Sequence, residues 1–216
     1  MAIITQGLMG GISGKTGPLI GSSWKGKAVL RAKPVYKKNR AFTQLQLNQQ
    51  EKFKLMRNFL IGIEYLLLLA FKTGNKQRNG FHEAFSVNMR EAIAGEVSPF
   101  RINYSNIRLS NGSITVLQPP VMMAEPGNKV KLVWSHPLQI GMNASDVDKA
   151  IAVFYAETDN LFLMSSFDNR RQDGELLFDA TLFTGKEVHV WFLYLSDNEA
   201  KASKSQYLGR VMVTAL

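Results

Sequence analysis

The sequence predicts an α+β fold: a glycine-rich basic arm with a β-hairpin, two helices, and an antiparallel β-sandwich of the immunoglobulin or fibronectin type III kind. Three observations lead there. Glycine and basic residues dominate the first forty positions, apolar residues then recur every three or four positions, and the final 115 or so residues alternate in short runs between turn signals. The expected parts are residues 1–40 (arm), 41–97 (two-helix segment) and 98–216 (sandwich).

The composition allows a packed core and excludes several kinds of chemistry. With 216 residues and 45% hydrophobic content, the chain suits one large or two small domains. There is no cysteine, which excludes disulfides, thiolate metal sites and a cysteine nucleophile. The N-terminus shows no secretory signal pattern, so we expect the cytoplasm, or an assembly released from the cell, as the location. The longest apolar run, residues 59–71, is too short for a membrane span of about 20 residues.

The net charge of +9 is distributed unevenly. Residues 1–90 hold 15 Lys or Arg against three acids, a balance of +12, whereas residues 91–216 hold 11 against 14, a balance of −3. A basic half suits nucleic acid, an anionic surface, or the acidic half of a neighbouring copy. The alternative is that the surface lysines only keep the protein soluble.

The arm is too polar and too rich in glycine to bury a core of its own. Its forty residues contain eight Lys or Arg, seven Gly and no acid. We therefore expect it to need a partner. The candidate interaction residues are its basic side chains and its single tryptophan: Trp24, Lys15, Lys25, Lys27, Arg31, Lys33, Lys37, Lys38 and Arg40.

Two strand patterns are expected within the arm. Residues 2–5 suit an edge strand, and residues 19–32 suit a hairpin that turns at Lys25-Gly26. Trp24 ends the first hairpin strand. It could stack on a nucleic-acid base, but the favoured interpretation is that it fills a hydrophobic pocket on a partner or on its own domain.

Gly14-Lys15-Thr16 invites comparison with a phosphate-binding loop, but the spacing fails. That motif needs a glycine five positions before its second glycine, and Met9 stands there. The glycines are better explained by close backbone contacts or positive φ angles.

Apolar residues at three- and four-residue spacing predict one long amphipathic helix from about residue 44 until Gly74. A second helix is expected over residues 81–93, ending at Gly95. Beyond it, Asn111-Gly112 predicts a type I′ hairpin. The other expected strands lie at 129–134, 150–155, 161–164, 176–178, 188–195 and 207–213.

No group of residues forms a recognisable catalytic or metal-binding pattern. His82 has no second histidine at ligand spacing, and Asp146, Asp148 and Asp159 lack the spacing of a calcium loop. His189 alternates with Trp191 in an expected core strand. The sequence therefore predicts a protein that is not an enzyme and has no cofactor and no metal.

Several motifs together resemble a known family. They are GGISGKTG at 10–17, SWKGK followed by R-x-K-P over 23–34, and Q-x-x-Q-x-x-K-F-K-L at 46–55. This combination is similar to an uncharacterised family of basic bacterial proteins of about this length, a domain of unknown function. The resemblance spans nearly the whole chain and implies one two-part architecture, but no activity.

The sequence thus favours a structural or interaction protein that self-assembles into an oligomer or filament, the arm and helices of one copy packing on the acidic sandwich of the next. The alternative is a nucleic-acid-binding protein whose basic arm neutralises phosphates, with a strong salt dependence. An enzyme is the weakest of the three hypotheses.

Overall fold

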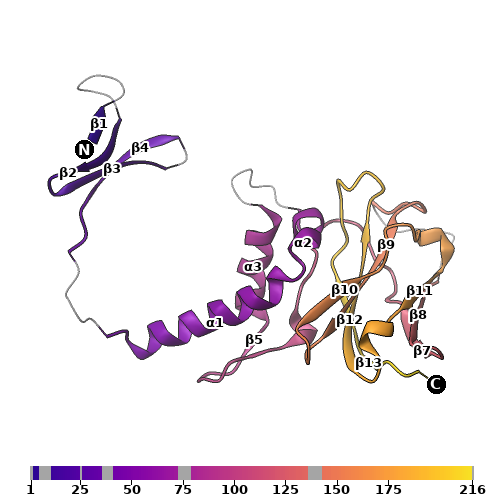
Figure 1. Ribbon diagram of the computed structural model, residues 1–216. Coiled ribbons are helices and arrows are strands. Elements are labelled where there is room, and N and C mark those ends of the chain that lie inside the picture. The colour runs from indigo at the N-terminus through magenta and orange to yellow at the C-terminus, as the bar shows by residue number, and fades with distance from the viewer. Residues whose placement is uncertain are drawn as a thin grey trace. The chain divides into compact units, whose positions relative to one another are not determined.

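The computed structural model describes residues 2–4, 11–24, 26–35, 41–72, 79–135 and 143–215. The chain divides into two compact units, residues 1–43 and residues 44–216. Helices and several antiparallel sheets occur together, which confirms the α+β class (Figure 1). None of the described helices has the length and apolar character that crossing a bilayer requires.

The first unit is a single antiparallel sheet, here called the N-terminal sheet, with its strands in sequence order (Figure 1). Gly17 and Gly26 take positive φ angles in its two tight turns. The expected edge strand and the hairpin over residues 19–32 are confirmed, whereas the second strand was not anticipated. The strands are β1 (Ala2–Ile4), β2 (Ile12–Thr16), β3 (Leu19–Trp24) and β4 (Lys27–Ala32).

The second unit begins with helices α1 (Gln44–Ile61), α2 (Glu64–Ala70) and α3 (Gly80–Glu91). The prediction of one long first helix is wrong, because the chain turns at Gly62 between α1 and α2. A Cβ at Gly62 would lie 2.9 Å from the ring of Phe162. Glycine therefore lets the ring of Phe162, in the strand over residues 161–164, pack closely against the helix break. The second expected helix is confirmed.

Two antiparallel sheets form the rest of the unit. The central sheet has the order β10-β9-β12-β13 and the outer sheet the order β11-β8-β7, while β5 and β6 form a short separate ribbon. The bounds are β5 (Ile93–Ala94), β6 (Arg101–Ile102), β7 (Val121–Glu125), β8 (Lys129–Val133), β9 (Lys149–Ala156), β10 (Leu161–Met164), β11 (Glu175–Asp179), β12 (Glu187–Leu195) and β13 (Gln206–Met212). Three single-turn 3₁₀ helices are η1 (Tyr104–Asn106), η2 (Arg171–Asp173) and η3 (Thr181–Phe183).

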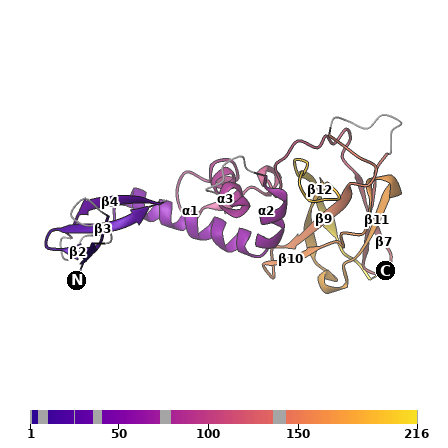
Figure 2. The ribbon, with the colours of Figure 1, turned by 90° about the horizontal axis from the view of Figure 1, so that it is seen from above.

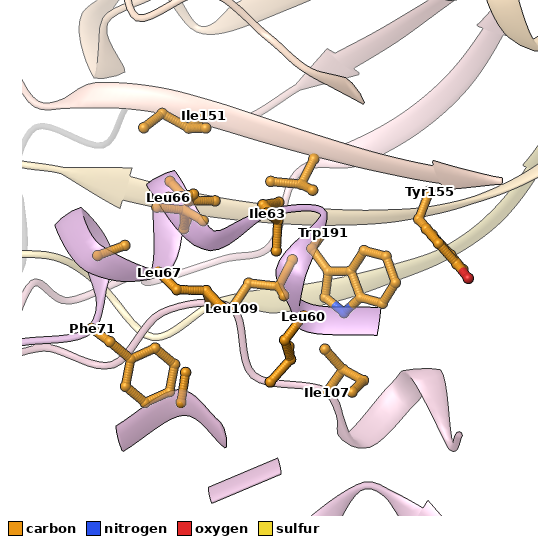
Figure 3. Close-up of a cluster of buried hydrophobic side chains, with 14 of the residues drawn as sticks. Leu60, Ile63, Leu66, Leu67, Phe71, Ile107, Leu109, Ile151, Tyr155 and Trp191 are labelled. Atoms are coloured by element: carbon orange, nitrogen blue, oxygen red, sulfur yellow. The ribbon is translucent and has the colours of Figure 1, made fainter. Parts of the chain in front are cut away.

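The central sheet is buried on both faces, because side chains alternate along its two inner strands. Ile151 and Trp191 belong to the core formed with the helices, which lie on one side of this sheet (Figures 2 and 3). Phe154 and Phe192 belong to the core formed with the outer sheet. The second unit therefore has three layers: helices, central sheet and outer sheet.

The predicted hairpin at Asn111-Gly112 is wrong. Asn111 instead forms a parallel bridge with Phe71, receiving the N–H of Lys72 at 3.2 Å and donating to the carbonyl of Ala70 at 3.2 Å. A Cβ at Gly112 would lie 2.1 Å from the carbonyl oxygen of Ala202. Contacts with distant segments thus override the local preference of Asn-Gly for a turn. Gly112 is needed because its backbone lies against the backbone of Ala202, where a side chain would not fit.

Of the other strands in this part, β7 was not anticipated, and the six predicted from residue 129 onward are confirmed within a few residues at their ends. The immunoglobulin or fibronectin type III assignment, and the separation of residues 41–97 from residues 98–216, stay predictions.

Candidate functional site

The N-terminal sheet has one basic face. In the register, Lys15 lies opposite Ile20, which lies opposite Arg31, and Trp24 lies opposite Lys27. Directly paired residues share a face, and alternate residues along a strand return to it. The sheet therefore places four of the nine predicted residues together. We call this the basic face: Lys15, Ile20, Ser22, Trp24, Lys27, Val29 and Arg31.

The opposite face is apolar or small, and we call it the apolar face: Thr16, Leu19, Gly21, Ser23, Ala28, Leu30 and Ala32. The backbone of Ile12 crosses part of it, since a Cβ at Gly21 would lie 1.9 Å from the carbonyl oxygen of Ile12. The remainder is open. Leu19 is 40% exposed and Leu30 is 53% exposed.

Apart from the segment at Gly11 and Ile12, the described residues of this unit place no second layer on either face. All six residues of β4 are exposed, and Trp24 on the basic face is 62% exposed. A sheet must bury one face against another element to gain hydrophobic stabilisation, and a single small layer has no interior. The N-terminal sheet therefore has strand geometry without a core of its own.

The remaining predicted residues lie next to this sheet or beyond the described residues. Lys33 follows β4, and its N–H donates to the carbonyl of Pro18 at 2.6 Å. Lys25, Lys37, Lys38 and Arg40 lie outside the described residues. Gly14-Lys15-Thr16 lies within β2 and does not lead into a helix, so the geometry differs from that of a phosphate-binding loop.

A second candidate site lies in the second unit and was missed by sequence reasoning. It is a cleft of about 610 Å³, here called the aromatic cleft, between α1, the β6–η1 segment and the end of β9. Figure 3 shows the hydroxyl of Tyr155 directed away from the buried apolar cluster. The lining residues are Leu55, Asn58, Phe59, Phe100, Arg101, Ile102, Tyr104, Tyr155, Glu157 and Asn160.

Aromatic rings contact one another in this cleft. The ring centroids of Phe59 and Tyr155 are 4.9 Å apart, and those of Phe59 and Tyr104 are 5.9 Å apart. The hydroxyl of Tyr155 donates to Oδ1 of Asn160 at 3.0 Å. Phe59 and Tyr155 are buried by these contacts, and Tyr104 is partly exposed. The rings therefore support the cleft from beneath, and the groups that reach its surface are mostly polar.

Glu157 is the negative group of the cleft. Burial, with the neighbouring Tyr155 and Glu157, raises the pKa of Tyr104, and burial also raises the pKa of Tyr155. Both phenols are thus neutral at pH 7. Among the ion pairs between described residues, none involves Glu157. Its carboxylate is exposed and is a hydrogen-bond partner of the Tyr104 hydroxyl.

The other ionisable residues named in the sequence analysis contact neighbouring side chains within the second unit. His189 is buried in β12, with Nδ1 2.8 Å from the hydroxyl of Tyr207. Burial, and then the charge of Arg210, lowers the pKa of His189. Asp148 is buried against Arg171 at 3.3 Å, and Asp159 pairs with Lys186. In the part of the chain that the structure describes, no three His, Asp or Glu lie together as metal ligands would.

Comparison with known protein families identifies the family to which the chain belongs. The model of DUF6266, a family of unknown function, matches residues 11–209. The chain belongs to the DUF6266 family. The DUF6266 match runs from just before β2 into β13, so it covers both units and confirms the resemblance to an uncharacterised family. A search of curated proteins finds no match.

Proposed function

We propose that this DUF6266 protein is a non-enzymatic structural protein that self-associates, the N-terminal sheet of one copy packing on the second unit of a neighbouring copy. The observation that supports the proposal is that described residues on both faces of the N-terminal sheet are exposed, with Leu19 and Leu30 on the apolar face and Trp24 on the basic face. A covering surface would supply the burial that this sheet lacks.

The apolar face favours a protein as the covering surface. Leu19, Ala28 and Leu30 gain free energy when they leave water, and a phosphate backbone offers no apolar surface for them. The basic face alone would suit either a protein or a nucleic acid. Only a protein partner accounts for both faces.

The charge distribution favours a second copy of the chain. Residues 1–43 hold eight Lys or Arg and no acid, whereas the second unit is close to neutral at +1, with +4 in residues 44–90 and −3 in residues 91–216. Unlike surfaces of identical chains can therefore attract each other. Such a head-to-tail contact produces a ring if it closes and a filament if it does not.

We also propose that the central and outer sheets form a sandwich of the fibronectin type III kind. The fourth strand in chain order, β10, pairs with β9, and the outer sheet keeps three strands. In a constant-type immunoglobulin sandwich the fourth strand joins the first sheet instead. Immunoglobulin and fibronectin type III sandwiches often serve as interaction modules in other proteins. By analogy, this fold agrees with an interaction role for the second unit.

A second candidate function is nucleic-acid binding, which the basic face favours. Lys15, Lys27 and Arg31 lie around an exposed Trp24, and sheets that bind single strands combine basic groups with stacking rings.

The test is the light-scattering mass of nuclease-treated protein at low salt and at about 1 M salt, where exposed charges are screened. Self-association predicts a mass several times 24.2 kDa at both salt concentrations. A monomer at both contradicts the proposal. A large mass that disappears on nuclease treatment supports the nucleic-acid alternative.

Two exposed leucines provide a matched pair of variants. Leu30 on the apolar face is 53% exposed, and Leu182 in η3 is 66% exposed. We expect Leu30→Asp to abolish assembly and Leu182→Asp to leave the mass unchanged. Equal effects of the two substitutions would argue against the N-terminal sheet as the interface.

A further inference from the structure

Another cleft of the second unit carries two lysines and no acidic residue among its described walls. Its volume is about 370 Å³, and it lies where the segment after α2, the segment before Ile114 and the connection between β12 and β13 meet. We call it the lysine cleft: Lys72, Asn111, Gly112, Ser113, Ala200, Lys201 and Ala202.

Backbone hydrogen bonds hold these three segments together. The N–H of Asn111 donates to the carbonyl of Ala70, and the N–H of Lys72 donates to the carbonyl of Asn111, each at 3.2 Å. The N–H of Ile114 donates to the carbonyl of Ala202 at 3.0 Å. The walls of the cleft are therefore part of the folded unit, and a ligand does not have to order them.

The loop that carries Lys201 is fixed by its own side chains. Oγ of Ser196 accepts the N–H of Lys201 at 2.9 Å, and Oδ1 of Asn198 accepts the N–H of Ala200 at 3.1 Å. The ammonium of Lys201 donates to Oδ1 of Asn143 at 3.1 Å. This acceptor is neutral, so it orients Lys201 without compensating its charge.

Lys72 is a partly buried cation. Among the ion pairs between described residues, none involves Lys72 or Lys201. Burial lowers the pKa of Lys72, and the attraction of Glu199 offsets this only in part. The carboxylate of Glu199 instead pairs with Lys149 at 2.7 Å. An anion in the cleft would therefore stabilise the charged form of Lys72.

The chemistry of the cleft favours a phosphate group over a single carboxylate. A phosphate monoester carries a charge of about −1.5 to −2 at pH 7 and three acceptor oxygens. The two ammonium groups match this charge, and the amide of Asn111 and the hydroxyl of Ser113 can donate as well. The volume of about 370 Å³ lies near the lower end of the range of about 300–1,000 Å³ for small-molecule pockets.

We propose that the lysine cleft binds the phosphate group of a small molecule, with Lys72 and Lys201 as the two cations that hold it. Binding here does not depend on the proposed self-association, because the described walls all belong to the second unit of one chain. The phosphate can be inorganic phosphate or part of a phosphate ester, and two probes separate these sources.

The test is calorimetric titration of the full-length protein with inorganic phosphate, ribose 5-phosphate and acetate at a fixed ionic strength of about 0.1 M. We expect both phosphate probes to bind and acetate not to displace them. Tighter binding of ribose 5-phosphate would show that the cleft holds the body of an ester as well. Equal affinities of the two probes would identify the phosphate group alone as the ligand.

Three variants of the full chain locate the binding. Lys72→Gln and Lys201→Gln each remove one cation and should weaken phosphate binding by about tenfold or more. Lys54→Gln removes an exposed lysine of α1 that does not line the cleft, and it should bind phosphate like the wild type. Without phosphate, Lys72→Gln should unfold at the same temperature as the wild type or at a higher one, because it removes a partly buried cation.

Three results would overturn the proposal. A wild-type protein that binds neither phosphate probe has no such site. Equal phosphate affinities in the wild type and in both cleft variants would place the ligand elsewhere, such as on the basic N-terminal sheet. Displacement of phosphate by an equal concentration of acetate would mean that the cleft accepts any anion. A loss of affinity confined to Lys72→Gln and Lys201→Gln supports the proposal.

Discussion

The N-terminal sheet and the central sheet are both four-stranded antiparallel sheets, but their strands lie in opposite surroundings. In β12, eight of nine residues are buried, whereas in β4 all six are exposed, although both strands contain valine and leucine. Strand propensity and pairing are thus enough to shape both sheets, but only layers of side chains on either face supply a core. The second unit therefore has a core of its own, and the proposed self-association is what would cover the N-terminal sheet.

The largest expected effect concerns the core between the two sheets of the second unit. Phe154 is fully buried and stacks on Phe178 with ring centroids 4.0 Å apart. Phe154→Ala should lower the free energy of unfolding by about 3–5 kcal/mol, because it removes buried surface and leaves a cavity. Urea unfolding measures this loss. Leu30→Ala in the N-terminal sheet, the control, should change the same transition by less than about 0.5 kcal/mol.

The next effect concerns how each region compensates its charges. Arg171 is buried, pairs with Asp148 at 3.3 Å and lies 3.6 Å from the ring centroid of Tyr194. Arg171→Ala should cost about 3 kcal/mol in thermal unfolding, because it leaves the buried Asp148 carboxylate without its cation. Arg31→Ala, at an exposed position of β4, is the matched substitution. If Arg171→Ala and Arg31→Ala lowered the thermal stability by similar amounts, the buried and the exposed arginine would not differ as we expect.

A smaller effect is expected at Gly112, where the backbone of the second unit passes close to the segment at Ala202. A methyl group there would lie 2.1 Å from the carbonyl oxygen of Ala202, so Gly112→Ala should cost about 1–3 kcal/mol as the segments separate. Ser113→Ala, one residue further and exposed, is the control in chemical denaturation. A Gly112→Ala protein as stable as this control would show that the segment yields without cost.

The smallest effect is a pH dependence confined to the second unit, since residues 1–43 contain no histidine. The pKa of His189 in the folded protein lies below its ordinary value of 6.5. Between these two values the unfolded chain binds more protons. Stability is therefore fully present above about pH 6.5 and falls as the pH drops towards the folded pKa, with a slope below about 1.4 kcal/mol per pH unit.

Unfolding at a series of pH values between 7.5 and 5 measures this slope, with His189→Asn as the comparison variant. The slope should be smaller in the variant. An equal slope in both proteins would assign the pH dependence to other groups, such as the nearby Glu157, Glu187 and Arg210.

Local patterns predicted the parts of the fold in which local and tertiary preferences agree. The inner strands β9 and β12 read as continuous apolar runs because both of their faces are covered. The hairpin over residues 19–32 could be predicted from its tight turn and the two flanking strand patterns alone. Asn111-Gly112 failed because Asn111 pairs with Phe71 across the unit, and β7 was missed because its Met-rich sequence does not alternate clearly.

The two candidate sites also differ in how far the sequence predicts them. Composition identified the basic residues and Trp24, but only the register shows that Lys15, Trp24, Lys27 and Arg31 share one face. The aromatic cleft could not be found from sequence, because its walls come from segments between Leu55 and Asn160 that meet only in the folded unit. No spacing rule relates such residues.

The most direct test of the central claim is amide hydrogen exchange measured at several protein concentrations. If a second copy covers the N-terminal sheet, protection of residues 12–32 should rise with concentration, while protection of β9 and β12 stays constant because their core is internal. Protection over residues 12–32 that is already complete in dilute, monomeric protein would contradict the account, since it would mean that the sheet needs no second copy.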